Sequence, residues 1–188
     1  MSLLVTNMKY MALDKQENKK KIGILGGTFD PAHRGHLSIS KEAKKRFGIG
    51  KIIWAVTKKN PFKSKSSLSL DKRIKYAKKI AQNNLFIKVK YYENKIKSNR
   101  TIDLIKNIKR NNKNTDIYFI MGADSLINFD KWKNSDLISS MCNILVFDRD
   151  RYKAKSLRSV SFKKYNKKSI RFVKFNKVNI SSSKLRKI

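Results

Sequence analysis

The 188-residue sequence has little cysteine, and it has no long apolar run. The single thiol, Cys142, excludes an intrachain disulfide and any zinc site with two Cys ligands, and it suits a reducing compartment. No segment approaches the roughly 20 apolar residues of a membrane helix. The opening Met1-Ser2-Leu3-Leu4-Val5 lacks the basic and apolar regions of a secretory signal. We therefore expect a cytoplasmic protein with no membrane partner.

Acidic residues are also scarce, since 13 Asp and Glu face 46 Lys and Arg, which gives a formal net charge of +33. Such a charge fits either a nucleic-acid-binding protein or a genome with a bias toward lysine codons. Basic residues occur in nearly every segment, whereas a nucleic-acid footprint is clustered. We therefore expect no specific nucleic-acid partner. A non-catalytic RNA or DNA binder, with Tyr91 and Tyr92 among lysines, remains an alternative that salt-dependent binding would reveal.

Apolar periodicity predicts strands that alternate with helices. Expected strands cover residues 22–25, 51–56, 86–92, 117–121, 143–147 and 170–175, and helices are expected over 37–47, over 71–81 and from Thr101 onward. Such alternation predicts an α/β fold with a single doubly wound, mainly parallel sheet. We expect residues 21–188 to form this one domain and residues 1–20 to form a flexible extension.

The turn after the first expected strand carries the most chemistry. Gly26 and Gly27 are expected to allow a tight turn whose amides approach a phosphate. His33 and His36 are three residues apart, so both can face one ligand at a helix N-terminus. The turn therefore predicts a phosphate site. A plain structural turn, or a two-histidine metal site, is the alternative, but Asp30 is the only carboxylate near enough to complete a metal site.

Two common nucleotide-binding signatures are absent from the sequence. There is no Gly-x-x-x-x-Gly-Lys-Ser/Thr segment, and no Gly-x-Gly-x-x-Gly follows the first strand. These absences disfavour P-loop kinases and ordinary dehydrogenases.

The segment from Gly26 to His36, GGTFDPAHRGH, resembles the His-x-Gly-His signature of a nucleotidyltransferase superfamily with a Rossmann-like fold. Within it the chain most resembles bacterial nicotinate-nucleotide adenylyltransferases. The resemblance implies that ATP and nicotinate mononucleotide are the substrates and that deamido-NAD and pyrophosphate are the products. It implies in-line attack on the α-phosphorus without a covalent enzyme intermediate. Mg²⁺ is expected to accompany ATP, bound by phosphates and water, with no metal site built by the protein.

Three further segments share in the resemblance: Gly122-Ala123-Asp124-Ser125-Leu126 with the following Trp132, Asn60-Pro61-Phe62-Lys63, and Ile180-Ser181-Ser182-Ser183-Lys184-Leu185-Arg186. By resemblance the residues fall into three groups: His33, His36 and Arg186 as catalytic, Gly26, Gly27, Thr28, Phe29, Ser181, Ser182 and Ser183 as ATP-binding, and Lys63, Thr101, Asp124 and Trp132 as nicotinate-nucleotide-binding. Trp132 is expected to stack on the pyridine ring.

Departures from the family pattern concern two places in particular. Arg100 stands where Tyr is frequent, and Arg149-Asp150-Arg151 replaces Arg-Pro-Gly, which puts the loop 148–159 in doubt. Phosphopantetheine adenylyltransferase shares the glycine turn and is the alternative enzyme, although Trp132 favours a pyridine nucleotide. A class I aminoacyl-tRNA synthetase fragment is disfavoured because the chain is too short. The sequence leaves a homo-oligomer open.

Overall fold

The structure is a computed structural model, and it describes residues 19–62, 66–149 and 151–174. Several predicted residues lie outside this part of the chain: Lys63, Ser181, Ser182, Ser183 and Arg186, together with residues 1–18 of the expected extension. Their predicted roles stay predictions.

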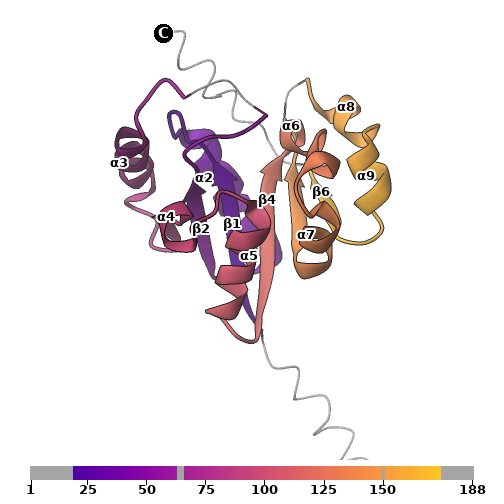
Figure 1. The fold of residues 1–188 in the computed structure, drawn as a ribbon, viewed down its shortest axis with the longest axis horizontal. Coiled ribbons are helices and arrows are strands. Elements are labelled where there is room, and N and C mark those ends of the chain that lie inside the picture. Colours follow the sequence, from indigo (N-terminus) through magenta and orange to yellow (C-terminus); the bar gives the residue numbers. More distant parts are fainter. Residues whose placement is uncertain (1–18, 63–65, 150, 175–188) are drawn as a thin grey trace, which may run out of the picture.

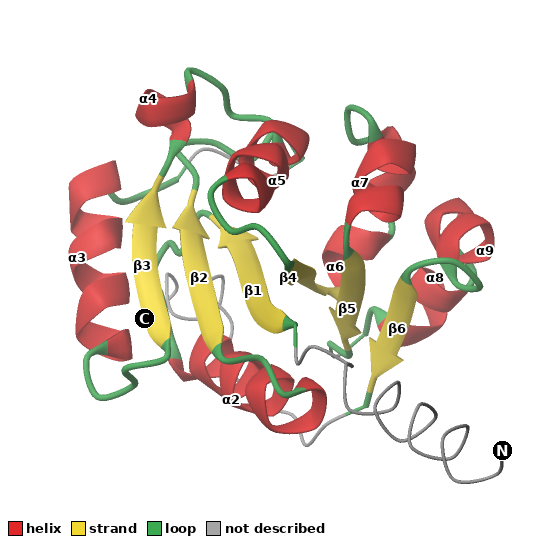
Figure 2. Ribbon diagram, turned by 90° about the horizontal axis from the view of Figure 1, so that it is seen from below, coloured by secondary structure: helices red, strands yellow, loops and turns green. Residues whose placement is uncertain are grey.

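A six-stranded sheet, in which every pairing is parallel, forms the centre of the described residues. Its strands are β1 (Lys20–Gly27), β2 (Lys51–Val56), β3 (Ile87–Tyr91), β4 (Thr115–Gly122), β5 (Asn143–Phe147) and β6 (Ile170–Val173). Their order across the sheet is β3-β2-β1-β4-β5-β6, as Figure 2 shows. The predicted doubly wound α/β fold is thereby confirmed. The chain winds outward from β1 to β3 and then returns to β4, so the topological switch point lies between β1 and β4.

Helices cover both faces of the sheet (Figure 1). Helices α2 (Arg34–Phe47) and α3 (Leu70–Ala81) pack on one face through Ala43, Ala77 and Ala81. The other face carries α5 (Thr101–Arg110), the 3₁₀ turn η1 (Phe129–Lys131) and α7 (Ser135–Met141). Short helices complete the set: α4 (Glu93–Ile96), α6 (Ala123–Leu126), α8 (Lys153–Leu157) and α9 (Val160–Tyr165).

Strand β1 shows why the sheet needs helices on both sides. Ile22 and Ile24 belong to the apolar cluster under α5, whereas Leu25 belongs to the cluster under α2 and α3. At Gly23 an added Cβ would lie 3.1 Å from side-chain carbons of Ile52 and Ile120. The apolar cluster under α2 and α3 therefore packs directly on the backbone of β1, and a larger residue at position 23 would force its neighbours to move.

Most predicted elements are observed, with boundaries that differ by a few residues. Strands β2 and β5 match the predicted ranges, while α2 begins at Arg34 rather than Leu37 and β1 begins at Lys20. Helices α4, α8 and α9 were not predicted, because single turns of four to six residues leave too few positions for a helical period to show. In the described part of the chain, no helix is long and apolar enough to cross a membrane.

Candidate active site

A cleft of about 980 Å³ opens at the carboxyl ends of the central strands. Ligands of doubly wound sheets bind at this edge, beside the switch point. Every predicted site residue that the structure describes lines this one cleft: Gly26, Gly27, Thr28, Phe29, His33, His36, Thr101, Asp124 and Trp132. Residues that are 106 positions apart in the chain, from Gly26 to Trp132, thus share one cavity.

The glycine pair does not make the tight turn that the sequence led us to expect. Gly26 and Gly27 are the last residues of β1, and the Gly27 carbonyl accepts a hydrogen bond from Thr57 N at 2.9 Å. The left-handed bend comes at Phe29, where φ is 49°. A Cβ on Gly26 would lie 3.5 Å from its nearest neighbour, Phe119 Cζ. Since packing tolerates a side chain at Gly26, its absence leaves backbone exposed on the cleft floor, where a ligand can approach it.

The two histidines cap the start of α2 reciprocally. His33 is the N-cap, and its Nδ1 accepts a hydrogen bond from Gly35 N at 3.1 Å. His36 Nδ1 accepts a hydrogen bond from His33 N at 3.2 Å. The ring centroids lie 4.0 Å apart, and Phe29 packs against His36 at 4.7 Å. Because an Nδ1 that accepts a hydrogen bond carries no proton, both imidazoles hold their proton on Nε2 in the neutral tautomer.

Electrostatics keep His33 neutral. Burial, and to a lesser degree the nearby Arg149 guanidinium, lower the pKa of His33 to about 4. At neutral pH this imidazole is therefore an uncharged hydrogen-bond donor through Nε2, held on the positive end of the dipole of α2. A fixed donor of this kind suits the oxygens of a phosphate chain.

An ion pair that lines the same cleft joins the ends of β4 and β5. Arg149 Nη1 donates to Asp124 Oδ2 at 2.8 Å, and the Asp124 side chain is only 14% exposed. Asp124 follows β4 in helix α6, whereas Arg149 follows β5. The pair therefore presents a cation and a carboxylate to the cleft from adjacent strand ends.

Trp132 and Thr101 form another part of the cleft wall. Trp132 is half-buried, and its ring meets Phe119 and Phe129 edge-on at centroid distances of 5.9 and 5.4 Å. It thus packs on the core and also faces the cavity. Thr101 is the first residue of α5, whose N-cap is Arg100. Thr101 is therefore not the residue that caps the helix.

A buried arginine, Arg73, holds together the loops after β1 and β2 and the segment before α3. Arg73, 2% exposed in α3, donates from Nη1 to the carbonyls of Thr28 (2.6 Å) and Thr57 (2.7 Å). Its Nη2 donates to Lys58 O at 3.1 Å and its Nε to Leu68 O at 3.1 Å. The loops after β1 and β2 are thereby tied to the start of α3. Burial lowers the pKa of Arg73, and the charges of Asp30 and Glu93 oppose that shift.

The Asp30 carboxylate holds the segment before α3 in place through hydrogen bonds. Its carboxylate is 2% exposed and accepts hydrogen bonds from Leu68 N at 3.0 Å and from Ser67 N at 2.8 Å. Among the described residues no group of three or more His, Cys, Asp or Glu side chains could hold a metal ion. This donor set fits a metal that arrives bound to substrate phosphates, which is how magnesium commonly binds in nucleotide-dependent enzymes.

The cleft also contains residues that motif reading did not assign. Tyr92, Lys131, Lys133, Arg149, Arg151 and Tyr152 line it. Arg149 had been noted only as a departure from the family pattern. The strand-end rule could have found it, because it lies two positions after β5 at the edge where ligands bind. Tyr92 follows β3, at the same edge.

A family model described as "Cytidylyltransferase-like" matches residues 24–188 of the chain. A protein of Pelagibacter ubique (strain HTCC1062) named "Probable nicotinate-nucleotide adenylyltransferase" is 61% identical over 172 residues, which is 92% of this chain and 95% of that protein. One of Clostridium novyi (strain NT) with the same name is 37% identical over 141 residues, 73% of this chain and 70% of that protein.

Solved structures agree on the fold. The structure titled "Plasmodium falciparum nicotinic acid mononucleotide adenylyltransferase complexed with NaAD" superposes with a TM-score of 0.71 at 23% identity. The match covers 89% of this chain and 83% of that chain. At this identity the likeness shows the shared architecture alone.

Proposed function

This chain belongs to the cytidylyltransferase-like family, and we propose that within it the chain acts as a nicotinate-nucleotide adenylyltransferase of NAD biosynthesis. The observation that carries the proposal is the single cleft that holds both the imidazole pair of the His-x-Gly-His segment and the indole of Trp132. One end suits a polyphosphate, and the other end offers a flat aromatic surface. The Pelagibacter relative, matched over nearly its whole length, carries the corresponding name.

In the proposed reaction, a phosphate oxygen of nicotinate mononucleotide attacks the α-phosphorus of MgATP. A new phosphorus–oxygen bond forms, the bond from the α-phosphorus to the bridging oxygen breaks, and pyrophosphate leaves with the electron pair. Because the attacking phosphate is already an anion, no general base is required. Catalysis then depends on alignment and on donors fixed where negative charge develops.

Several of the described residues can supply these hydrogen-bond donors. We assign the Nε2–H groups of His33 and His36 and the exposed backbone of Gly26 to Phe29 to the ATP phosphates. Asp124, Thr101 and Trp132 are assigned to the nicotinate nucleotide. The family resemblance implies further roles for residues outside the described part of the chain. Lys63 would bind the nicotinate nucleotide, Ser181, Ser182 and Ser183 would bind ATP, and Arg186 would be catalytic.

The test is to present the purified chain with MgATP and one acceptor at a time: nicotinate mononucleotide, nicotinamide mononucleotide or phosphopantetheine. We expect deamido-NAD and pyrophosphate with the first acceptor at the highest kcat/KM. Adenylylation of phosphopantetheine at a higher kcat/KM would transfer the assignment to the alternative enzyme. No product with any acceptor, together with tight and steeply salt-dependent binding of single-stranded DNA, would favour the nucleic-acid binder.

A His36→Ala variant ties the activity to this cleft. Removing one fixed donor to a developing charge costs about 10²- to 10³-fold in turnover. We expect that loss together with a near-native circular dichroism spectrum, because the variant gives up a capping hydrogen bond from His33 N and keeps the backbone hydrogen bonds of helix α2. Turnover equal to that of the unmodified chain would remove the imidazole pair from the mechanism.

A further inference from the structure

Trp132 lies in a segment that contacts both the sheet and helix α9. Its N–H donates to Phe129 O at 3.0 Å, and its carbonyl accepts from Ser135 N at 3.1 Å. These short-range bonds hold the turn between η1 and α7 but do not attach it to the rest of the molecule. Besides the packing of the Trp132 ring on Phe119 of β4, two residues that flank the indole, Asp130 and Ser135, attach the turn to the rest of the molecule.

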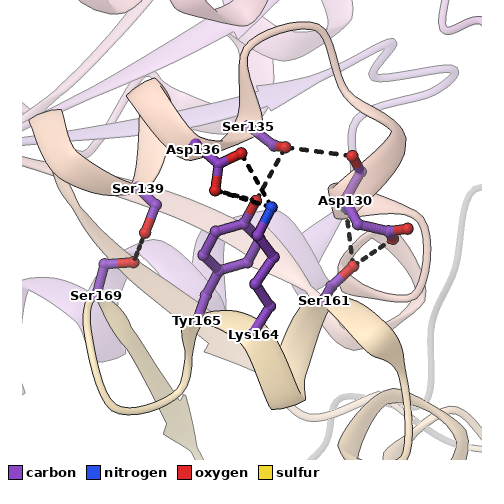
Figure 3. Close-up of polar contacts among 8 residues, drawn as sticks. All are labelled: Asp130, Ser135, Asp136, Ser139, Ser161, Lys164, Tyr165 and Ser169. Atoms are coloured by element: carbon purple, nitrogen blue, oxygen red, sulfur yellow. Dashed lines mark hydrogen bonds and ion pairs between the residues drawn. The ribbon is translucent and has the colours of Figure 1, made fainter.

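Both of these residues bond to helix α9, as Figure 3 shows. The Ser161 hydroxyl is fully buried, accepts from Asp130 N at 2.9 Å and donates to Asp130 Oδ1 at 2.6 Å. The Tyr165 hydroxyl lies 3.0 Å from Ser135 Oγ and 3.1 Å from Asp136 Oδ1. Ser135 Oγ in turn donates to Asp130 O at 3.2 Å. One helix thus holds the chain two residues before and three residues after the indole.

Aromatic packing continues the same connection. The Tyr165 ring, 1% exposed, meets Phe129 edge-on at 5.3 Å, and Phe129 meets Trp132 edge-on at 5.4 Å. The three rings form a continuous row from α9 to the cleft wall. A shift of α9 would therefore displace the indole through both the hydrogen bonds and the rings, since close-packed interiors transmit small displacements.

We propose that Ser161 and Tyr165 of α9 are positioning residues that set the place of Trp132 for the pyridine ring of the nucleotide substrate. The proposal rests on the proposed function. Neither residue lines the cleft.

The experiment compares Ser161→Ala and Tyr165→Phe with a matched control, Ser139→Ala. The control removes another buried hydrogen bond of the same interface, between Ser139 and Ser169 at 2.6 Å, but touches neither Asp130 nor Ser135. Tyr165→Phe keeps the ring contact with Phe129 and removes only the hydroxyl. All three variants are expected to lower the melting temperature by similar, small amounts.

Only the first two variants should change substrate binding. Misplacing one aromatic stacking partner is worth about three- to tenfold in affinity. We expect the KM for nicotinate mononucleotide to rise by about that factor in Ser161→Ala and Tyr165→Phe, with the KM for ATP within twofold. Quenching of tryptophan fluorescence by nicotinate mononucleotide alone should shift to higher concentration by the same factor, and Ser139→Ala should match the unmodified chain in both assays.

The outcomes separate the two proposals. If the unmodified chain forms no deamido-NAD, the proposed function fails, whatever the variants do. If the unmodified chain is active but both α9 variants keep its KM for nicotinate mononucleotide, the positioning role is wrong. An equal rise of that KM in Ser139→Ala, or an equal rise of both substrates' KM values in the α9 variants, would likewise overturn it in favour of general destabilisation.

Discussion

At the scale of single residues, the paired imidazoles are both structural and chemical. Each one satisfies a backbone N–H at the start of α2 through Nδ1, which fixes its ring and leaves its proton on Nε2. The sequence could predict that His33 and His36 share one face of a helix N-terminus. It could not predict the reciprocal capping, because that depends on the extended backbone of His33 and on the bend at Phe29.

The depressed pKa of His33 makes stability depend on pH in a defined window. The unfolded side chain titrates near 6.5, whereas the folded one titrates at about 4. Between these values the unfolded state binds a proton that native His33 does not. The stabilisation is therefore complete above pH 6.5 and is lost as pH falls toward 4.

We expect this dependence to disappear in His33→Asn, which keeps an N-cap acceptor for Gly35 N but does not titrate. Between pH 7 and pH 4.5 the free energy of unfolding should fall by about 2 kcal/mol more in the unmodified chain than in the variant. Urea denaturation at the two pH values measures the difference. Parallel losses in both proteins would mean that His33 is not held neutral by the fold.

At the scale of elements, the cleft depends on loops that have little secondary structure of their own. Arg73 bonds carbonyls from the loop after β1, the loop after β2 and the segment before α3. Asp30 fixes that same segment by accepting bonds from Ser67 and Leu68. Glu93 of α4 accepts from Lys58 N at 3.1 Å. Long-range bonds of this kind hold together the loops on the imidazole side of the cleft.

Arg73→Ala tests this arrangement. The substitution leaves four part-buried carbonyls without their donor and removes a buried guanidinium, so we expect the free energy of unfolding to fall by about 3 kcal/mol or more. Lys72→Ala is the matched control on the same helix, because Lys72 is exposed and its loss should change stability by no more than about 0.5 kcal/mol. Urea denaturation compares them, and equal stabilities would show that the loops do not depend on Arg73.

The elements themselves were largely predictable. The apolar runs of β2 and β5 are short, continuous and bounded by polar residues, so their limits could be read exactly. Helices α8 and α9 could not be predicted, since their apolar side chains follow no period over one turn. The position of α9 over η1 depends on long-range contacts such as Ser161 with Asp130. Because α9 could not be predicted, the sequence indicated a ligand for Trp132 but not the helix that holds its segment in place.

At the scale of the whole molecule, the site is a consequence of strand order. The imidazole side of the cleft comes from the end of β1 and the start of α2. The side with Thr101, Asp124 and Trp132 comes from the start of α5 and the segment after β4, at the point where the winding reverses. The motifs predicted the residues on each side of the cleft separately. The parallel sheet brings these residues together at one edge. The net charge of +33 adds a general attraction for anionic substrates, whose reach in physiological salt is about 8 Å.

Other predictions at this scale stay predictions: the absence of a specific nucleic-acid partner, the cytoplasmic location, a homo-oligomer and the flexible extension over residues 1–20. The central claim is that the cleft holds both substrates at once, with the triphosphate at the imidazole pair and the pyridine ring on Trp132.

A crystal structure of the chain with nicotinate mononucleotide and a non-hydrolysable ATP analogue tests that claim most directly. We expect phosphate oxygens within hydrogen-bond distance of His33 Nε2 and His36 Nε2, near the backbone of Gly26 to Phe29, and a pyridine ring parallel to the indole of Trp132. Both ligands bound elsewhere, with the two imidazoles and the indole untouched, would contradict the account.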